Sequence, residues 1–186
     1  MSVKPDHWIA NMAKKEGLIS PFAAKPSRKG VISYGLSAYG YDMRLADEFR
    51  LLTDMQAGVT DPKQTNDSQY QEIKSKALLI PPNSFALGRS LEYFRIPRDI
   101  LALCTGKSTY ARCGLVVNVT PLEPEWEGYV TISMANTGPL PLRVYANEGI
   151  AQVIFLEAAD ECRTSYADKK GKYQAQRRVT GARVSK

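Results

Sequence analysis

The stretch from residue 104 to residue 136, CTGKSTYARCGLVVNVTPLEPEWEGYVTISMAN, holds most of the side chains that could do chemistry. In it, Lys107, Ser108 and Thr109 place an ammonium beside two hydroxyls, and Arg112 follows four residues after Ser108. If residues 108–112 form a helical turn, Ser108 and Arg112 share a face next to free backbone N–H groups. Such donors suit a triphosphate. The alternative is a turn with two surface cations.

Several other motifs that bind phosphate, bind metal or carry out catalysis are missing from this sequence. A P-loop ending at Gly106 would need its first glycine at position 101, where the sequence has Leu101. The only histidine is His7, and the three cysteines are too far apart for a zinc site. The zinc deaminase signature is absent, and a Ser-His-Asp triad would depend on a histidine near the N-terminus. Zinc chemistry and histidine-based nucleophilic catalysis are therefore excluded.

The charge balance favours an anionic partner. Twenty-five Lys and Arg against nineteen Asp and Glu give 25 − 19 = +6. Nucleic acid, acidic lipid and a phosphorylated metabolite all fit this excess, and so does a mildly basic surface without a partner. No apolar run is long enough to span a membrane or to serve as a signal peptide, and the odd cysteine count does not indicate disulfides. We therefore expect a cytoplasmic protein.

The elements that must position these side chains are mostly short strands. Residues 1–22 hold one predicted helix, from His7 to Glu16, capped by Asp6 and ended by Gly17. Residues 23–30 and 57–72 are predicted loops, and 167–186 form a basic tail or arm. The predicted strands are 41–45, 48–53, 77–80, 84–89, 100–105, 115–120, 128–134, 140–145 and 151–157. This spacing indicates a sandwich or barrel, in one domain over residues 1–186.

Long motifs in this chain resemble those of one family. The run GKSTYARCGLVVNVTPLEPEWEGYV closely resembles that of bacterial dCTP deaminases, the zinc-independent branch of the trimeric dUTPase-like superfamily. The likeness begins at KPDHWIANMAKKEGLISPF and continues through VISYGLSAYGYDMRL, IPPNSFALGRSLEYFRIPRDI and YANEGIAQVIF to GKYQAQRRVT. It covers nearly the whole chain, with the motifs in the family's order.

The resemblance implies a distorted β-barrel of jelly-roll type, with a short N-terminal helix and a C-terminal arm, residues 165–186, that closes over the site. It further implies a homotrimer with shared active sites, and hydrolysis of dCTP to dUTP and ammonia. The expected partner is a deoxynucleoside triphosphate such as dCTP or dUTP, with neither nucleic acid nor a membrane as partner. The expected cofactor is Mg²⁺ bound through the nucleotide phosphates, with no metal ligand from protein side chains and no zinc.

The resemblance also assigns roles to individual residues. The family's K-S-T-Y-A-R motif grips the phosphates, and its serine and arginine, here Ser108 and Arg112, help to position the base. Glu123 takes the place of an acidic residue near the sugar, which in bifunctional and dUTPase relatives helps to activate a water for phosphate chemistry. The full predicted set of nucleotide-binding residues is Lys107, Ser108, Thr109, Tyr110, Ala111, Arg112, Thr131, Ile132, Ser133, Gln152, Tyr166, Lys172 and Gln176.

One position departs from the family pattern. The family strand V-T-[IL]-E-[IF]-S-N carries the glutamate that activates water, and the matching position here is Ser133. A serine hydroxyl has no basic form near neutral pH, and loss of a general base costs about 10²–10⁴-fold in rate. Glu127 shares the strand face, but it is six residues away, about 20 Å at roughly 3.3 Å per residue. The reach of Glu123 and Glu125 cannot be derived from the sequence, and the smaller serine leaves room for a larger base.

Three functions remain open at this level. The first is a dCTP deaminase in which another acid, or a relay through Ser133, activates the water. The second is an enzyme of the same fold with changed chemistry, either a phosphohydrolase that uses Glu123 or a deaminase of a modified or larger base. The third is a nucleotide-binding homologue without turnover. All three bind a deoxynucleoside triphosphate.

Overall fold

The computed structural model describes residues 2–26, 29–53, 58–64 and 67–184. Most of the regular secondary structure is β-strand, with two short α-helices and one 3-10 helix in the described residues. In chain order the elements are β1 (Ser2–Val3), α1 (Asp6–Lys15), β2 (Ile19–Ser20), β3 (Gly35–Ser37), β4 (Gly40–Leu52), η1 (Asp67–Gln69), β5 (Tyr70–Lys74), β6 (Ala77–Ile80), β7 (Phe85–Arg95), β8 (Ile100–Gly106), α2 (Ser108–Ala111), β9 (Leu115–Asn118), β10 (Glu127–Asn136), β11 (Leu142–Tyr145) and β12 (Gly149–Glu157).

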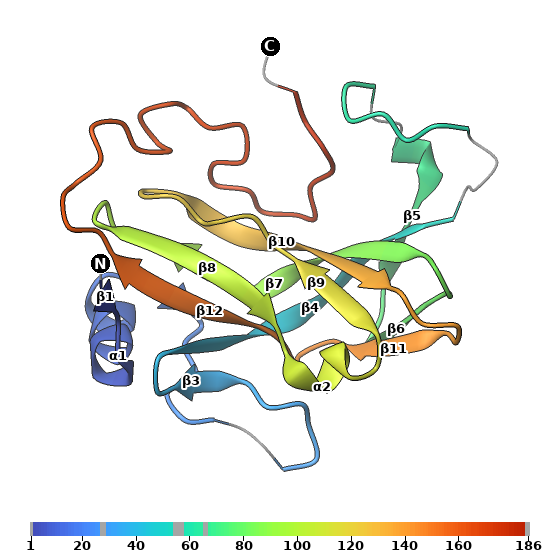
Figure 1. The fold of residues 1–186 in the computed structure, drawn as a ribbon, viewed down its shortest axis with the longest axis horizontal. Coiled ribbons are helices and arrows are strands. Elements are labelled where there is room, and N and C mark those ends of the chain that lie inside the picture. The colour runs from blue at the N-terminus through green and yellow to red at the C-terminus, as the bar shows by residue number, and fades with distance from the viewer. Residues whose placement is uncertain (1, 27–28, 54–57, 65–66, 185–186) are drawn as a thin grey trace.

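The strands form a strongly curled antiparallel sheet. Within the described part of the chain, ten strands join in one sheet, whose main path runs β1-β12-β4-β7-β10-β9, while β11 and β6 form a separate pair. The long strand β4 pairs with β12 at one end and with β7 at the other, so the sheet wraps around its own apolar face (Figure 1). The predicted mainly β, barrel-like fold with an N-terminal helix and a C-terminal arm is confirmed.

Side chains alternate between core and outer surface along β7 and β10. In β10 the even positions Val130, Ile132 and Met134 are at most 1% exposed, while the odd positions are only partly buried. β7 has the same pattern, so the outward odd positions of the two strands form one continuous face. Because residues that lie directly opposite on paired strands point to the same side, this face can present several side chains to one ligand.

The N-terminal helix α1 packs against the sheet through Ile9, which is fully buried. The prediction that Asp6 caps the helix is wrong: Asp6 lies in the first turn and Pro5 occupies the capping position, without a side-chain hydrogen bond. Gly17 follows the helix with φ 66°, as expected for a residue that ends a helix. No helix in the described residues is long and apolar enough to cross a membrane.

Two predictions about strands need correction. The expected strands 41–45 and 48–53 are one strand, β4, because Ala46 and Asp47 continue the extended backbone through a shift in register against β7. The predicted loop 57–72 ends early, since residues 70–74 form β5, which pairs with β4 from Glu48 to Leu52. Both errors arise because pairing with a neighbouring strand overrides the local polarity of the sequence. Residues 54–57 and 65–66 of this region lie outside the described part.

Candidate nucleotide site

A cavity of about 610 Å³ lies between the outer face of the curled sheet and the C-terminal arm. Its floor comes from β7 and β10, one wall from residues 118–126, and its cover from the arm, which crosses above β10 in Figure 1. The residues that line it are Tyr70, Phe85, Leu87, Asn118, Val119, Thr120, Pro121, Leu122, Glu123, Trp126, Val130, Thr131, Ser133, Tyr166, Lys172, Tyr173, Gln176, Thr180, Gly181 and Ala182. Apolar and aromatic walls with a few polar groups are typical of a small-molecule site.

Ser133 lies on the floor of this cavity. It pairs with Leu87 of β7 and Asn118 of β9, and all three residues line the cavity. Of the acidic residues that the structure describes, only Glu123 also lines it. The structure therefore answers what the sequence left open, because Glu123 faces the same space as Ser133 whereas Glu125 and Glu127 do not.

The three neighbouring carboxylates have different partners. Glu123 accepts a hydrogen bond from the ammonium of Lys169, 3.2 Å away in the arm, and both side chains are about half exposed. Glu125 pairs with Arg98 at 2.6 Å and Glu127 with Arg95 at 3.2 Å. Glu123 thus pairs with a residue of the arm. Glu127 pairs instead with Arg95, the last residue of β7, and Glu125 with Arg98, which follows that strand.

The arm is fastened along β10 by backbone and side-chain bonds. The backbone N–H of Tyr129 donates to the carbonyl of Gln176 at 3.0 Å, and the Gln176 side-chain amide donates to Thr131 Oγ1 at 2.9 Å. The N–H of Thr180 donates to the same hydroxyl at 3.3 Å. Gly128 permits this close approach, since a Cβ there would lie 3.1 Å from the Gln176 nitrogen. Two predicted binding residues, Thr131 and Gln176, therefore meet at the cavity.

The first part of the arm folds around Tyr166. The Tyr166 hydroxyl accepts from the N–H of Tyr173 at 3.1 Å, and the indole N–H of Trp126 donates to the Tyr173 carbonyl at 3.0 Å. Gly171 packs directly on the Tyr166 ring, where a Cβ would lie 2.1 Å from the nearest ring carbon. The Lys172 ammonium donates to the carbonyl of Arg183. Tyr166 and Lys172, which the resemblance assigns to nucleotide binding, both line the cavity, and they also hold the shape of the arm.

The predicted phosphate motif forms the expected helical turn. α2 spans Ser108–Ala111, and the guanidinium of Arg112 donates to the Ser108 carbonyl at 3.0 Å, so the two residues share one face. Lys107 does not point freely into solvent, because its ammonium pairs with Asp42 at 2.7 Å and its side chain is 11% exposed. Its charge can reach an anion there only if the anion competes with Asp42.

The remaining members of this motif differ in exposure. Tyr110 is buried, its hydroxyl accepts from the Tyr145 N–H at 3.0 Å, and burial raises the pKa of Tyr110 to about 12. Ala111 is exposed, and Thr109 lines a shallow depression with Glu148. Tyr110 therefore anchors the turn, and the exposed side of α2 is left for a ligand or another subunit.

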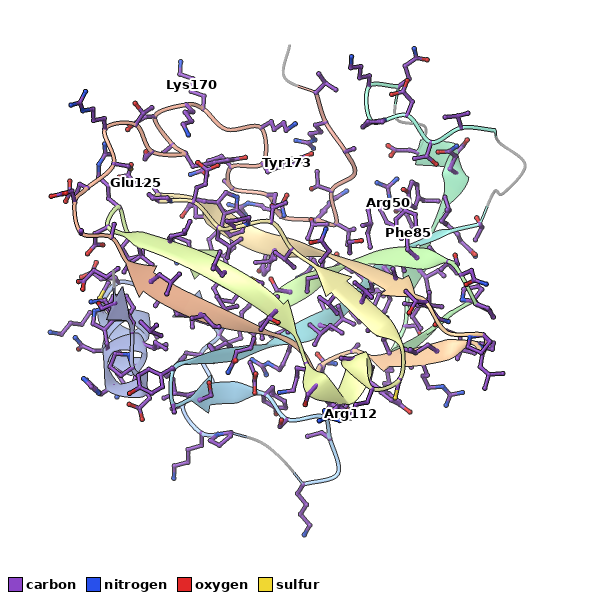
Figure 2. The ribbon with its side chains drawn as sticks, viewed as in Figure 1. Arg50, Phe85, Arg112, Glu125, Lys170 and Tyr173 are labelled. Atoms are coloured by element: carbon purple, nitrogen blue, oxygen red, sulfur yellow. The ribbon has the colours of Figure 1, made fainter. Side chains whose placement is uncertain are left out.

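Within a single chain, most of the predicted site residues fall into two groups that lie apart from each other. The cavity group contains Glu123, Thr131, Ser133, Tyr166, Lys172 and Gln176. The turn group contains Lys107, Ser108, Thr109, Tyr110, Ala111 and Arg112, and among the described residues none of these lines the cavity. Figure 2 places Arg112 and Tyr173 on opposite sides of the molecule.

Two further predicted residues belong to neither group. Gln152, on β12, donates to the Ser37 hydroxyl at 2.8 Å, and it does not line the cavity. Ile132 is fully buried among the core residues, so its side chain cannot contact a ligand. The alternation of β10 turns the side chain of Ile132 inward, between the outward Thr131 and Ser133.

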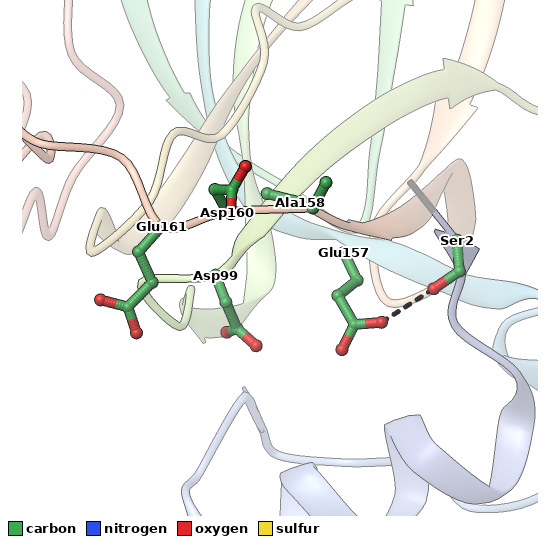
Figure 3. Close-up of a pocket in the computed structure, with 7 residues that line it drawn as sticks. Ser2, Asp99, Glu157, Ala158, Asp160 and Glu161 are labelled. Carbon is green, nitrogen blue, oxygen red and sulfur yellow. Dashed lines mark hydrogen bonds between the residues drawn. The ribbon is translucent and has the colours of Figure 1, made fainter.

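Sequence reasoning missed the cavity residues that come from other strands. Strand pairing, which the sequence does not specify, places Leu87 and Asn118 opposite Ser133 and Phe85 opposite Ala135. The Tyr70 ring, which also lines the cavity, packs edge-on against Phe85 with the ring centroids 6.1 Å apart. A different pocket, of about 500 Å³, holds the carboxylates Asp99, Glu157, Asp160 and Glu161 (Figure 3). Its negative charge makes it unsuitable for a triphosphate.

Comparisons with known proteins agree with this fold. Residues 3–158 match the family model described as dCTP deaminase-like. The dCTP deaminase of Nautilia profundicola is 59% identical over 187 residues, which cover 100% of both chains. The dCTP deaminase of Granulibacter bethesdensis is 58% identical over 184 residues, 99% of this chain and 100% of the relative. The crystal structure of 2'-deoxycytidine 5'-triphosphate deaminase from Agrobacterium tumefaciens has a TM-score of 0.62 at 13% identity, over 82% of this chain and 47% of that one, and shows likeness of fold alone.

Proposed function

We propose, since this chain belongs to the dCTP deaminase-like family, that it hydrolyses dCTP to dUTP and ammonia in the cavity beneath its C-terminal arm. The observation that carries the proposal is that Glu123 and Ser133 line one largely apolar cavity of nucleotide size. Cytosine would lie against the aromatic and aliphatic floor, and the polar groups of the arm would bind the sugar and phosphates.

Glu123 is the group best placed to activate water. In this mechanism its carboxylate takes a proton from the water whose oxygen attacks C4 of cytosine, and the proton then passes to the departing amine, which leaves as ammonia. The Ser133 hydroxyl orients the water as both donor and acceptor, without itself acting as a base. The Lys169 ammonium, 3.2 Å from the carboxylate, holds Glu123 in place through an ion pair and a hydrogen bond.

The separation of the two residue groups supports a shared site in a homotrimer. Arg112 and the arm lie on opposite sides of one chain, so a nucleotide held by both needs the turn group of one subunit and the cavity of another. Mixing Arg112→Ala protein with Gln176→Ala protein tests this assembly by nucleotide binding. Random mixing of equal amounts gives ½ × ½, so about a quarter of the sites regain both intact groups. Mixed protein that binds no better than either variant alone would exclude shared sites.

Mg²⁺ would enter with the triphosphate. Among the described residues no three His, Cys, Asp or Glu side chains gather as a possible metal site, so we assign it no protein ligand. The ion would neutralise part of the phosphate charge, which leaves Lys107, Arg112 and Lys172 to orient the nucleotide.

Product analysis tests the reaction. The protein is incubated with dCTP, 5-methyl-dCTP and dUTP in the presence of Mg²⁺, and nucleotides, ammonia and pyrophosphate are quantified. Ammonia and dUTP from dCTP support the proposal. Pyrophosphate and a monophosphate would instead identify the phosphohydrolase, and binding without product a homologue without turnover. Preference for 5-methyl-dCTP would instead identify the second candidate, a deaminase of a larger base, which the small Ser133 side chain on the cavity floor favours.

Glu123→Gln is the decisive variant, with Glu127→Gln as its matched control. Both remove one carboxylate that is paired with a cation near β10, but only Glu123 lines the cavity. Glu123→Gln should lower turnover by about 10²–10⁴-fold, while Glu127→Gln should stay within about threefold of the parent. Equal effects of the two variants would remove Glu123 from the mechanism.

A further inference from the structure

Arg50 is a buried cation whose surroundings leave part of its guanidinium unpaired. The residue is 7% exposed, and one terminal nitrogen donates to Asp67 Oδ1 at 2.6 Å. The guanidinium lies over the Tyr70 ring, 5.0 Å from its centre. Its Nε has no hydrogen-bond partner among the described residues. A buried unpaired donor is costly, so its retention in this position requires an explanation.

Strand pairing places Arg50 in the same row of side chains as Ser133. Arg50 on β4 lies opposite Leu87 on β7, and Leu87 lies opposite Ser133 on β10. Side chains that oppose one another in this way point to the same face of the sheet. Arg50 therefore lies at one end of the cavity floor, next to Phe85 in Figure 2, and it reaches the cavity boundary through Tyr70.

Near its end, the arm approaches Arg50 at Gly181. A Cβ on Gly181 would lie 3.1 Å from the Arg50 Nη1 and 3.7 Å from Asp67 Oδ1, so an added methyl group would make a tight contact with the guanidinium. The N–H of the preceding residue, Thr180, donates a hydrogen bond to Thr131 on β10. Gly181 is outside the left-handed region of φ, so a substitution there acts through this contact and not through backbone strain.

We propose that Arg50, held by Asp67 and Tyr70, is the seat on which the arm closes at Gly181, and that it is a positioning residue for the nucleotide site. In the arm position that the structure shows, the Nε–H has no partner among the described residues, and further closure of the arm over a ligand would bring an acceptor of the arm, such as a backbone carbonyl, to it. The link to ligand binding rests on the proposed function, since it requires a nucleotide beneath the arm. The contact between Arg50 and the arm at Gly181 does not itself require a nucleotide.

A double-mutant cycle between Gly181→Ala and Arg50→Ala tests the seat. Hydrogen exchange of arm amides at 172–183 in nucleotide-free protein is the first measurement, and the dissociation constant for dCTP is the second. Gly181→Ala should speed arm exchange by about fivefold or more and weaken binding by about three- to tenfold, with exchange in the β4 and β12 core unchanged. In the Arg50→Ala background the same substitution should change arm exchange by less than about twofold.

The possible outcomes are distinguishable. Equal effects of Gly181→Ala in both backgrounds, or unchanged arm exchange, would overturn the seat whether or not nucleotide binds. If the two substitutions are coupled in arm exchange but dCTP does not bind, the contact between Arg50 and the arm is supported and the proposed function fails. If Arg50→Ala does not fold, Asp67→Asn and Arg50→Lys replace it, since each keeps part of the ion pair. Arg50→Lys should restore the fold but not the coupling, because lysine lacks the planar fork.

Discussion

In the Glu123→Gln variant, which lacks the proposed general base, replacing Ser133 with glutamate is expected to raise dCTP turnover by about 10²–10⁴-fold, the usual contribution of a general base. That factor corresponds to about 3–5 kcal/mol of activation free energy at 1.4 kcal/mol per tenfold. The structure permits the change, because Ser133 points into a cavity of about 610 Å³ and away from the core. The larger side chain therefore does not overpack the interior. The apolar floor from Phe85 and Leu87 would desolvate the new carboxylate and so raise its pKa toward the pH of the reaction, where a general base is most effective.

The assay is the release of ammonia from dCTP under single-turnover conditions, which reports the chemical step separately from product release. Ser133→Gln is the matched control, since the glutamine has nearly the same volume but no basic form. It should bind dCTP like the glutamate variant and show no gain in rate. A glutamate variant that binds dCTP within about threefold of the parent and is no faster would refute the reasoning, because the cavity would then not present C4 of cytosine to position 133.

The remaining predictions concern the turn, the core, the arm and the cysteines. Arg112→Ala should weaken nucleotide binding about tenfold or more without changing the melting temperature, measured by calorimetry, because the guanidinium is exposed and its hydrogen bond within the described part of the chain is to the Ser108 carbonyl of its own turn. Ile132→Ala should lower the free energy of unfolding by about 2–5 kcal/mol in urea titrations, whereas Ser133→Ala should change it by less than about 1 kcal/mol. Gly171→Ala should expose the arm to trypsin, since the added methyl group would meet the Tyr166 ring. Burial raises the pKa of the Cys104 thiol to about 12, so its reactive thiolate appears only as the pH approaches that value. At pH 8, iodoacetamide should label the exposed Cys113 at least about a hundredfold faster than Cys104 in the folded protein, and at similar rates after unfolding, as read by mass spectrometry.

The sequence predicted local features well. Ala77–Ile80 is a strand with the predicted ends, and Ser108–Ala111 is the helical turn that the spacing of Ser108 and Arg112 required. Polarity misled the prediction at Tyr70–Lys74, where exposed residues form a strand because β4 offers an edge for pairing. Local patterns specify a turn or a strand, but not the neighbour that completes it.

In the candidate site, too, motifs within one segment were predictable from the sequence, whereas contacts between strands were not. The cavity members Thr131, Ser133 and Gln176 came from motif resemblance, whereas Leu87 and Asn118 enter the site only through cross-strand register. The resemblance assigned Glu123 to the site, but the spacing of the residues did not predict that Glu125, two residues later, turns toward Arg98 and away from the cavity. That difference depends on the backbone between them, where Glu125 has a positive φ of 61°. Such a turn cannot be derived from composition or spacing.

The alternation of β10 has a consequence for how this protein can evolve. The inward residues Val130, Ile132 and Met134 form part of the core, and the outward residues Thr131 and Ser133 line the cavity in which we propose that the ligand chemistry takes place. Selection for folding and selection for catalysis therefore act on separate positions of the same ten-residue strand. An outward residue can drift, and reaction chemistry can be lost, weakened or redirected, while the folded population stays constant. An intact fold in a relative of this protein is therefore evidence of common ancestry but not of activity. The effect of each outward residue on turnover has to be measured separately.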